Sequence, residues 1–371
     1  MNGFSIEESK GVYGAKIKVI GVGGGGGNMI NHMVREGING IDLIAANTDA
    51  QALENCLAKT KIQLGKKGLG AGMRPEVGKE SALESYDEIK SSLEKSDIVF
   101  IASGFGGGTG TGAAPIVAQA AKEVGALTVA VVTRPFAFEG KKRAKLADLG
   151  INELRKESDS IVIIPNDKLL SIVDAKFGIK DSFRIVDDVL SRAVGGMSLV
   201  VLSSGQSDIN VDFADVQTVM SHRGMALMGI GESTGDEAAI EAIKSAIESP
   251  LLDNMSINGA LGVLVHFQLP PTYPLNEIST AMGLIMDCAD EDADVIFGTT
   301  TDENMPENSV KVTIVATGFE NKAEAKELKA LNTNQEAIKK ERILRLKKVS
   351  GGYEGQDDYL DIPTYIRHQM D

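Results

Sequence analysis

The sequence predicts an α/β fold in which a nucleotide-binding domain with a parallel sheet is joined by a long core helix to a second α/β domain. Two observations lead to this prediction. Residues 16–46 and residues 98–133 each read as a strand, a glycine-rich turn, a helix and a second strand, which is the order of a parallel crossover unit. Strand and helix patterns then alternate again over residues 225–316.

The first unit opens with a buried strand over residues 16–22, which breaks directly into Gly23 to Gly27 and Asn28. We expect a helix to follow this turn and to end at Gly37, before a strand over residues 41–46. The apolar face of that helix is expected to contain Met29, Met33 and Val34. Glycine lets the backbone approach an anion closely and direct N–H groups toward it, so the turn is a candidate phosphate site.

A second turn, Gly104 to Gly112, follows a strand over residues 98–102 and consists almost entirely of Gly and Thr. A helix is expected from Ala113, with Pro115 in its first turn, before a strand over residues 127–132. One glycine-rich turn can be a plain flexible connection. The presence of two such turns, each opening a helix, favours phosphate binding.

Both turns are predicted at the carboxyl ends of parallel strands, where open α/β sheets bind their ligands. The P-loop pattern is absent, so backbone N–H groups are expected to bind the phosphates. Gly21, Gly23 and Gly26 also fit the dinucleotide fingerprint, which keeps a nicotinamide-dependent oxidoreductase as an alternative. The second turn and the lack of a well-placed catalytic histidine argue against that alternative.

Polar residues follow other predicted strands. Asn47, Thr48 and Asp49 end the second strand, where they can reach a sugar, a phosphate or a hydrated metal, or form a plain turn. Glu139 and Arg143 have the spacing of one helix face. They can contact a ribose and a phosphate, or form a solvent-exposed i,i+4 ion pair.

A base-binding position is predicted farther along the chain. Asn166 lies at the carboxyl end of a short buried strand over residues 161–165, and apolar residues recur at helical spacing from Asp181 onward. Phe183 and Asp187 are four residues apart near the start of this long core helix, so a ring and a carboxylate can face one place. A carboxylate accepts hydrogen bonds from the N1–H and N2–H₂ edge of guanine, so guanine is the expected base.

The second half of the chain begins with a polar stretch over residues 205–215. Asp212 suits a helix N-cap and Asp215 the third helical position, so capping and function explain the two carboxylates equally well. Strands are then expected over 225–230, 261–267, 294–297 and 310–316, and helices over 237–247 and 275–288. Charge rises after residue 320, as in a tether, and the acidic stub 357–371 carries aromatic and aliphatic side chains suited to docking on a partner.

Composition excludes several classes of function. The 371-residue chain has a formal net charge of −14, which opposes nucleic-acid binding because no basic face is available. Cys56 and Cys288 have neither disulfide nor zinc-site spacing, and the four histidines are scattered, so no protein-bound metal is predicted. Without a signal peptide or a run of about 18 apolar residues, the chain is expected to be cytoplasmic and without direct membrane insertion.

Taken together, these motifs resemble the FtsZ family of tubulin-like GTPases over residues 15–318 and again over 357–371. The most specific signature is Gly106-Gly107-Gly108-Thr109-Gly110-Thr111-Gly112. It is supported by Asn47-Thr48-Asp49, Arg134-Pro135-Phe136, Glu139-Gly140 and the stretch from Asn210 to Asp215. The chain departs from the family pattern at Gly27, where many members have a second Asn, and in the segment before Asn210, which is slightly longer.

The resemblance implies GTP and GDP as ligands, with Mg²⁺ held through the phosphates and not by protein side chains. The residues it assigns to the nucleotide are Gly24, Gly25, Gly26, Gly27, Asn28, Asn47, Asp49, Gly107, Gly108, Thr109, Gly110, Thr111, Glu139, Arg143, Asn166, Phe183 and Asp187. Glu139 is assigned to the ribose and Arg143 to the phosphate region. Asn166 and Asp187 are assigned to guanine, with Phe183 stacked on it.

The resemblance also implies that Asn210, Asp212 and Asp215 hydrolyse the GTP of the next subunit in a head-to-tail filament, which forms the mid-cell ring of bacterial cytokinesis. The tail is similar to the FtsZ peptide that docks on membrane-tethering division proteins such as FtsA. Its docking residues are expected to be Asp361, Ile362, Pro363, Tyr365, Ile366 and Arg367. A scaffold that binds nucleotide without hydrolysing it is a further alternative.

The expected organisation has six parts. They are an N-terminal extension (1–15), a GTP-binding domain (16–180), the connecting core helix (181–204), a C-terminal, GTPase-activating α/β domain (205–318), a flexible linker (319–356) and the partner-docking peptide (357–371).

Overall fold

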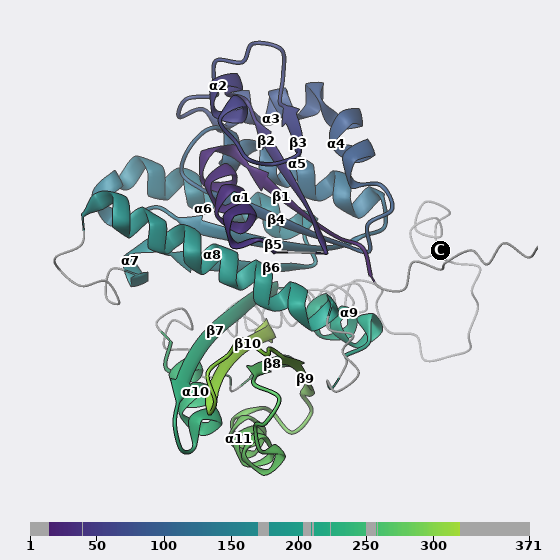
Figure 1. Ribbon diagram of the computed structural model, residues 1–371. Helices are drawn as coiled ribbons and strands as arrows, with labels where there is room; N and C mark the ends of the chain where they lie inside the picture. The colour runs from purple at the N-terminus through teal and green to yellow at the C-terminus, as the bar shows by residue number, and fades with distance from the viewer. Residues whose placement is uncertain are drawn as a thin grey trace, which may run out of the picture. The chain divides into compact units, whose positions relative to one another are not determined.

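The structure is a computed structural model, shown in Figure 1, that describes residues 15–38, 40–169, 178–202, 209, 211–222, 224–249, 257 and 259–319. Four parts that the sequence singles out lie outside the described residues. They are the N-terminal extension up to residue 14, Asn210, the linker from residue 320 and the docking peptide.

The described residues form a ten-stranded sheet with the order β3-β2-β1-β4-β5-β6-β7-β10-β8-β9 (Figure 1). Its strands are β1 (Ile17–Val22), β2 (Ile41–Asn47), β3 (Thr60–Gln63), β4 (Ile98–Gly104), β5 (Leu127–Arg134), β6 (Ser160–Pro165), β7 (Gly224–Thr234), β8 (Gly262–Leu269), β9 (Asp294–Thr301) and β10 (Ser309–Phe319). The strands β1 to β6 pair in parallel, β10 is antiparallel to β7 and β8, and β9 is parallel to β8. The predicted parallel crossover sheet and second α/β region are confirmed.

Helices cover both faces of the sheet. They are α1 (Gly23–Glu36), α2 (Ala50–Glu54), α3 (Pro75–Glu84), α4 (Tyr86–Leu93), α5 (Thr109–Glu123), the 3₁₀ helix η1 (Ala137–Glu139), α6 (Lys141–Glu157), α7 (Asn166–Leu169), α8 (Ile179–Leu202), α9 (Phe213–Ser221), α10 (Ala238–Ile247) and α11 (Leu275–Cys288). Side chains of α1, α2, α8 and α9 share one apolar core, and those of α3 to α6 share another. A third core packs α10 and α11 against β8 and β10.

Side chains alternate between the two cores along the central strands. Ile17 and Val19 of β1 belong to the core with α8, whereas Ile20 and Val22 belong to the core with α5. Because successive residues of a strand point to opposite faces, this pattern requires helices on both sides. The carboxyl ends of β1 and β4 therefore emerge between two helical layers, where the two glycine turns begin.

Both glycine turns are shorter than the sequence predicts. The helix α1 begins at Gly23 and α5 begins at Thr109, so part of each glycine run is the first helical turn. Pro115, expected in that first turn, instead lies in the interior of α5. Glycine has low helix propensity, but close packing between the two runs overrides that preference. As predicted, α1 ends at Gly37, which has the left-handed conformation (φ 68°).

One face of α1 was assigned incorrectly from the sequence. Met29 and Met33 are fully buried as expected, but Val34 is exposed and Ile30 takes the remaining buried position. Ile30 lies four residues before Val34, so at 100° per residue the two positions are about 40° apart around the helix axis.

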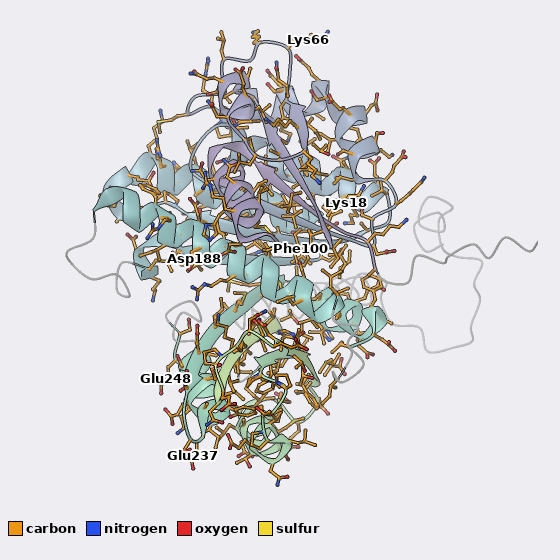
Figure 2. All side chains as sticks on the ribbon, viewed as in Figure 1. Lys18, Lys66, Phe100, Asp188, Glu237 and Glu248 are labelled. Carbon is orange, nitrogen blue, oxygen red and sulfur yellow. The ribbon has the colours of Figure 1, made fainter. Side chains whose placement is uncertain are left out.

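The long core helix is confirmed. It runs for 24 residues from Ile179 to Leu202 and contacts α1, β5, β8, β9 and β10. Figure 2 labels Asp188 on this helix, where it passes close to α1. Among the described residues, no helix combines the length and hydrophobicity needed to cross a membrane.

Candidate functional site

The two glycine turns lie directly against each other at the carboxyl ends of β1 and β4. A Cβ atom added at Gly23 would lie 2.9 Å from the backbone nitrogen of Gly110, and one added at Gly25 would lie 3.0 Å from that of Gly104. This approach requires glycine, and Gly23 also has a positive φ of 74°. The first turns of α1 and α5 therefore present their unpaired N–H groups side by side, which is an arrangement suited to anions.

Other glycines leave one side of this arrangement open. Among the described residues, no atom lies within 4 Å of a Cβ position at Gly24, Gly27 or Gly107. By contrast, a Cβ at Gly26 would overlap the carbonyl oxygen of Ala102, and one at Gly108 would overlap that of Gly72. The predicted phosphate-binding residues thus divide into glycines that allow close packing and glycines that face free space.

The Asn47–Asp49 stretch joins the second glycine turn. The Thr48 and Thr109 hydroxyl oxygens lie 2.6 Å apart, which links the end of β2 to the start of α5. The Asp49 carboxylate accepts from the backbone N–H groups of Gln51 and Ala52 at 3.0 and 3.1 Å, so it caps α2. Asn47 is buried, and its Oδ1 accepts from the Asp49 N–H at 3.2 Å. The plain-turn interpretation therefore describes the local bonding of Asp49, while Thr48 connects this turn to the site.

Thr111 shapes the second turn from within. It is buried, and its hydroxyl oxygen accepts from the Gly106 N–H at 2.9 Å. Gly106 has a positive φ of 99°. Thr111 therefore holds the turn closed, whereas Thr109 at the N-terminus of α5 is only half-buried.

Glu139 and Arg143 do not share one helix face as expected. Glu139 ends η1, Arg143 lies in α6, and Gly140 with φ 100° separates them. They are nevertheless paired, with Arg143 Nη1 2.5 Å from Glu139 Oε2. The other Glu139 oxygen accepts from the Phe136 N–H at 3.0 Å. The ion-pair alternative thus describes the structure, and the Arg143 side chain remains 42% exposed and accessible to an anion.

A cleft of about 820 Å³ joins the first glycine turn to the core helix. Its lining residues are Asn28, Asn31, His32, Arg35, Glu36, Phe183, Arg184 and Asp187. Asn28 from α1 thereby lies in the same cavity as Phe183 and Asp187 from α8, which brings together three of the residues predicted to bind the nucleotide. Burial raises the pKa of Asp187 to about 6, and the nearby His32 opposes this shift.

An aromatic cluster and an unpaired amide border the predicted base position. Phe183 is 40% exposed and forms a T-shaped pair with Phe136 at a centroid distance of 5.4 Å, and Phe136 stacks on Phe138 at 4.9 Å. Asn166 is buried, yet its Oδ1 has no hydrogen-bond partner in the described part of the chain. A buried acceptor without a partner costs about 1–3 kcal/mol, which a ligand donor would recover.

Several cleft residues were not predicted from the sequence. Asn31, His32 and Arg35 follow Asn28 at i+3, i+4 and i+7, so they occupy one face of α1. That spacing was the signal that could have identified them.

The acidic pair lies away from this cleft. Asp212 is at the N-cap position of α9 and Asp215 is in its first turn, as predicted, but the Asp212 side chain makes no capping hydrogen bond. Both carboxylates are exposed and have no hydrogen-bond or ion-pair partner among the described residues. Asp187 is near the start of α8, whereas α9 follows its end, and Figure 1 shows α7 and α9 near opposite ends of this helix. From Asp187 to the end of α8 at Leu202 the helix rises by about 23 Å, so the acidic pair and the base cleft lie apart in one chain.

These features fit a nucleoside polyphosphate. The adjoining helix N-termini suit phosphates, the cleft accommodates a sugar and base, and the unpaired Asn166 oxygen and the Asp187 carboxylate both accept hydrogen bonds. Guanine offers two adjacent N–H donors to such acceptors. Gly27 has open space beside it, so the asparagine found at this position in many family members would also fit.

Comparisons with known proteins identify both halves of the chain. The GTPase domain of the Tubulin/FtsZ family matches residues 16–174, and the C-terminal domain of the FtsZ family matches residues 224–320. The cell division protein FtsZ of Helicobacter pylori strain J99 is 46% identical over 376 residues, which cover 99% of this chain and 96% of the relative. The cell division protein FtsZ of Pseudomonas aeruginosa is 46% identical over 386 residues, which cover 96% of this chain and 97% of the relative. The oxidoreductase alternative finds no support in these matches.

Solved structures give the same result. An empty FtsZ dimer of M. jannaschii has a TM-score of 0.78 and 47% identity, covering 82% of this chain and 89% of that one. The GTPγS-bound protofilament of CetZ2 from Haloferax volcanii has a TM-score of 0.71 at 21% identity, which shows likeness of fold alone. Because the curated relatives match at 46% identity over nearly the whole chain, the protein belongs to the FtsZ family.

Proposed function

We infer that this protein is a GTPase of bacterial cell division that polymerises into filaments, and we propose that its active site is completed by the neighbouring subunit. The observation that carries the second proposal is the separation of the nucleotide cleft from the acidic pair along α8. Phosphoryl transfer to water requires a pocket that stabilises the phosphate charge and groups that orient the attacking water. The nucleotide cleft supplies only the pocket, and the acidic pair supplies only the groups that orient water.

The first part is the nucleotide pocket. The N-termini of α1 and α5 bind the phosphates through backbone N–H groups of Gly24 to Asn28 and Gly107 to Thr111, with Asn47 and Asp49 close by. In this proposal Glu139 contacts the ribose and Arg143 contacts the phosphates, which requires the ion pair between the two residues to open. Asn166 and Asp187 accept from guanine, and Phe183 packs on the base. Mg²⁺, bound through the phosphates, would neutralise part of their charge.

The second part is the acidic pair on α9. Asp212 and Asp215 are exposed and unpaired within the described residues, so they can be presented to another molecule. When they reach the phosphates of an adjacent subunit, together with Asn210, they hold and polarise the attacking water. Hydrolysis then occurs only at a subunit contact, while the pocket of each subunit binds GTP alone.

Such a contact joins two different surfaces of the same protein. A heterologous contact of this kind repeats without closing and builds an open head-to-tail filament. We place these filaments at the division site, with residues 16–180 binding GTP, 181–204 connecting and 205–318 activating the neighbour. The linker 319–356 and the peptide 357–371 would attach the filament to a membrane-tethering division protein such as FtsA.

The test is phosphate release by the pure protein with GTP and Mg²⁺ over a range of protein concentrations. Because association completes the site, activity per molecule should rise steeply with concentration and fall toward zero on dilution. Constant activity per molecule down to nanomolar protein would refute the shared site. GTP binding without phosphate release at any concentration would instead support the scaffold alternative.

A further inference from the structure

Three potential metal ligands converge beside the base cleft, between α1 and α8. His32 and Glu36 lie one helical turn apart on α1, and Asp188 projects from α8 (Figure 2). One ligand atom from each lies within 4.8 Å of the others. His32 Nε2 is 3.2 Å from Glu36 Oε1 and 3.3 Å from Asp188 Oδ1. Within the described residues this is the single cluster of three such groups.

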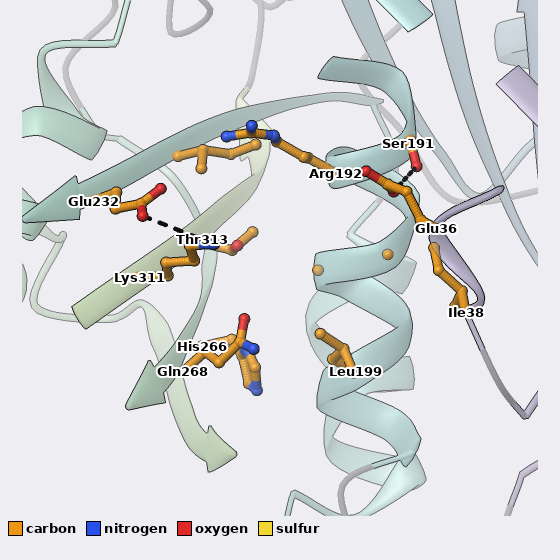
Figure 3. Close-up of a pocket in the computed structure, with 13 residues that line it drawn as sticks. Glu36, Ile38, Ser191, Arg192, Leu199, Glu232, His266, Gln268, Lys311 and Thr313 are labelled. Carbon is orange, nitrogen blue, oxygen red and sulfur yellow. Dashed lines mark hydrogen bonds and ion pairs between the residues drawn. The ribbon is translucent and has the colours of Figure 1, made fainter. Parts of the chain in front are cut away.

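Two neighbouring side chains orient the carboxylates. The Ser191 hydroxyl donates to Glu36 Oε2 at 2.9 Å, a bond that Figure 3 shows, and Arg192 Nε donates to Asp188 Oδ2 at 2.9 Å. Each carboxylate is thereby held by one oxygen while its other oxygen faces His32. Such outer hydrogen bonds typically fix the ligands of protein metal sites.

The two distances from His32 Nε2, 3.2 Å to Glu36 Oε1 and 3.3 Å to Asp188 Oδ1, are compatible with three ligands around one transition-metal ion. A tetrahedral zinc ion with ligands at about 2.0–2.1 Å places those ligands about 3.3 Å apart. A single proton on His32 Nε2 can bond well to one of the two carboxylate oxygens, whereas one cation contacts all three atoms.

We propose that His32, Glu36 and Asp188 bind a divalent first-row transition metal ion, with zinc as the best match and water as the remaining ligand. An imidazole and two carboxylates suit zinc, cobalt or manganese, while magnesium and calcium prefer oxygen ligands alone. The sequence predicted no metal site because the third ligand, Asp188, is more than 150 residues away from the first two.

The site is accessible and well placed to act on the core helix. Glu36 lines both the base cleft and a second cavity of about 280 Å³ between α8 and strands β7, β8 and β10, shown in Figure 3. An ion can therefore enter without opening the fold. Once bound, it would tie α1 to α8 next to Asp187 and so stabilise the folded chain. This inference does not depend on the proposed shared GTPase site.

The experiment measures Co²⁺ and Zn²⁺ binding to the full-length protein by equilibrium dialysis and visible absorption. GDP and excess Mg²⁺ are present, so that metal bound to the nucleotide does not contribute. We expect one tight ion per chain, with affinity at least tenfold weaker in His32→Gln and Asp188→Asn. His222→Gln is the matched control, because His222 faces one carboxylate, Asp294, at 3.2 Å.

Unchanged binding in either ligand variant, or equal loss in the His222 control, would overturn the proposal. The absence of a stoichiometric ion in the wild-type protein would do the same. Circular dichroism checks that each variant is folded. A measurement on the wild-type chain does not depend on whether a variant folds. Zn²⁺ should protect His32, and not His222, from acylation by diethylpyrocarbonate. Equal labelling of His32 with and without Zn²⁺ would contradict the proposed metal site.

Discussion

The hydroxyl groups of Thr48 and Thr109 lie 2.6 Å apart and connect the end of β2 to the first residue of α5. These residues are 61 positions apart in the sequence, yet they hold two parts of the nucleotide site in one arrangement. The hydrogen bond is partly buried, so little water competes for it. It is the direct link between the Asn47–Asp49 stretch and the second glycine turn.

Removing this bond should weaken nucleotide binding. Thr48→Val keeps the shape of the side chain but loses the hydroxyl, and we expect GTP affinity to fall by about 1 kcal/mol, the usual value of one such bond. Thr48→Ser keeps the hydroxyl and serves as the control. Isothermal titration with GTP compares the two. Equal affinities in the valine and serine variants would show that the bond does not order the site.

Two adjacent glycines should respond differently to the same substitution. A Cβ at Gly26 overlaps the Ala102 carbonyl oxygen, so Gly26→Ala should force α1 away from β4 and lower the free energy of unfolding by about 1–3 kcal/mol. Gly27→Ala meets no atom of the described residues within 4 Å and lies inside α1, so it should raise the free energy of unfolding by about 0.5–1 kcal/mol, the difference in helix propensity between Gly and Ala. Urea unfolding gives both values. Similar losses in the two variants would contradict the packing described for the first turn.

Asp187 should determine the preference for guanine. Asp187→Ala leaves the base-edge donors of guanine without a partner, so GTP affinity should fall by about 1–3 kcal/mol while discrimination against ATP relaxes. Competition binding of GTP and ATP measures both effects. Unchanged affinity, or unchanged discrimination, would remove Asp187 from this role.

The same carboxylate should make GTP binding depend on pH. Its pKa is raised to about 6 by burial, and only the ionised form accepts both guanine hydrogen bonds. Protonation below the pKa therefore opposes binding, and affinity at pH 5 should be roughly tenfold lower than at pH 7. Asp187→Asn does not titrate, so subtracting its profile removes the contribution of the phosphates. The buffer should contain no transition metal ion. Parallel pH profiles for the wild-type protein and Asp187→Asn would show that Asp187 does not cause the pH dependence of GTP binding.

The tail should serve attachment and not assembly. Deleting residues 357–371 is expected to leave sedimentation of GTP-induced filaments and phosphate release intact, and to abolish recruitment to vesicles that carry the tethering division protein. A chain with the same fifteen residues in scrambled order is the control for length and charge. Loss of assembly in the truncated protein would show that the tail belongs to the filament-forming core.

Much of the fold and site followed from the sequence because it depends on local patterns. Strand and helix periodicity located both crossover units, and the i,i+4 spacing of Phe183 and Asp187 placed them in one cleft. Features that depend on contacts between distant segments were missed. The burial of Ile30 in place of Val34 is set by packing against the sheet, and the helical start at Gly23 is set by the neighbouring turn. No local pattern contains that information.

The most direct test of the shared active site mixes two inactive variants. Asp215→Ala keeps the pocket but loses the acidic pair, and Asp187→Ala keeps the acidic pair but has a poor pocket. In an equal mixture, random co-assembly places a normal acidic pair against a normal pocket at about a quarter of contacts, because the contact joins unlike surfaces. Co-sedimentation first confirms that both variants enter the same filaments. We predict that phosphate release by the mixture then exceeds the sum of the separate variants, whereas strictly additive rates would contradict a site shared between subunits.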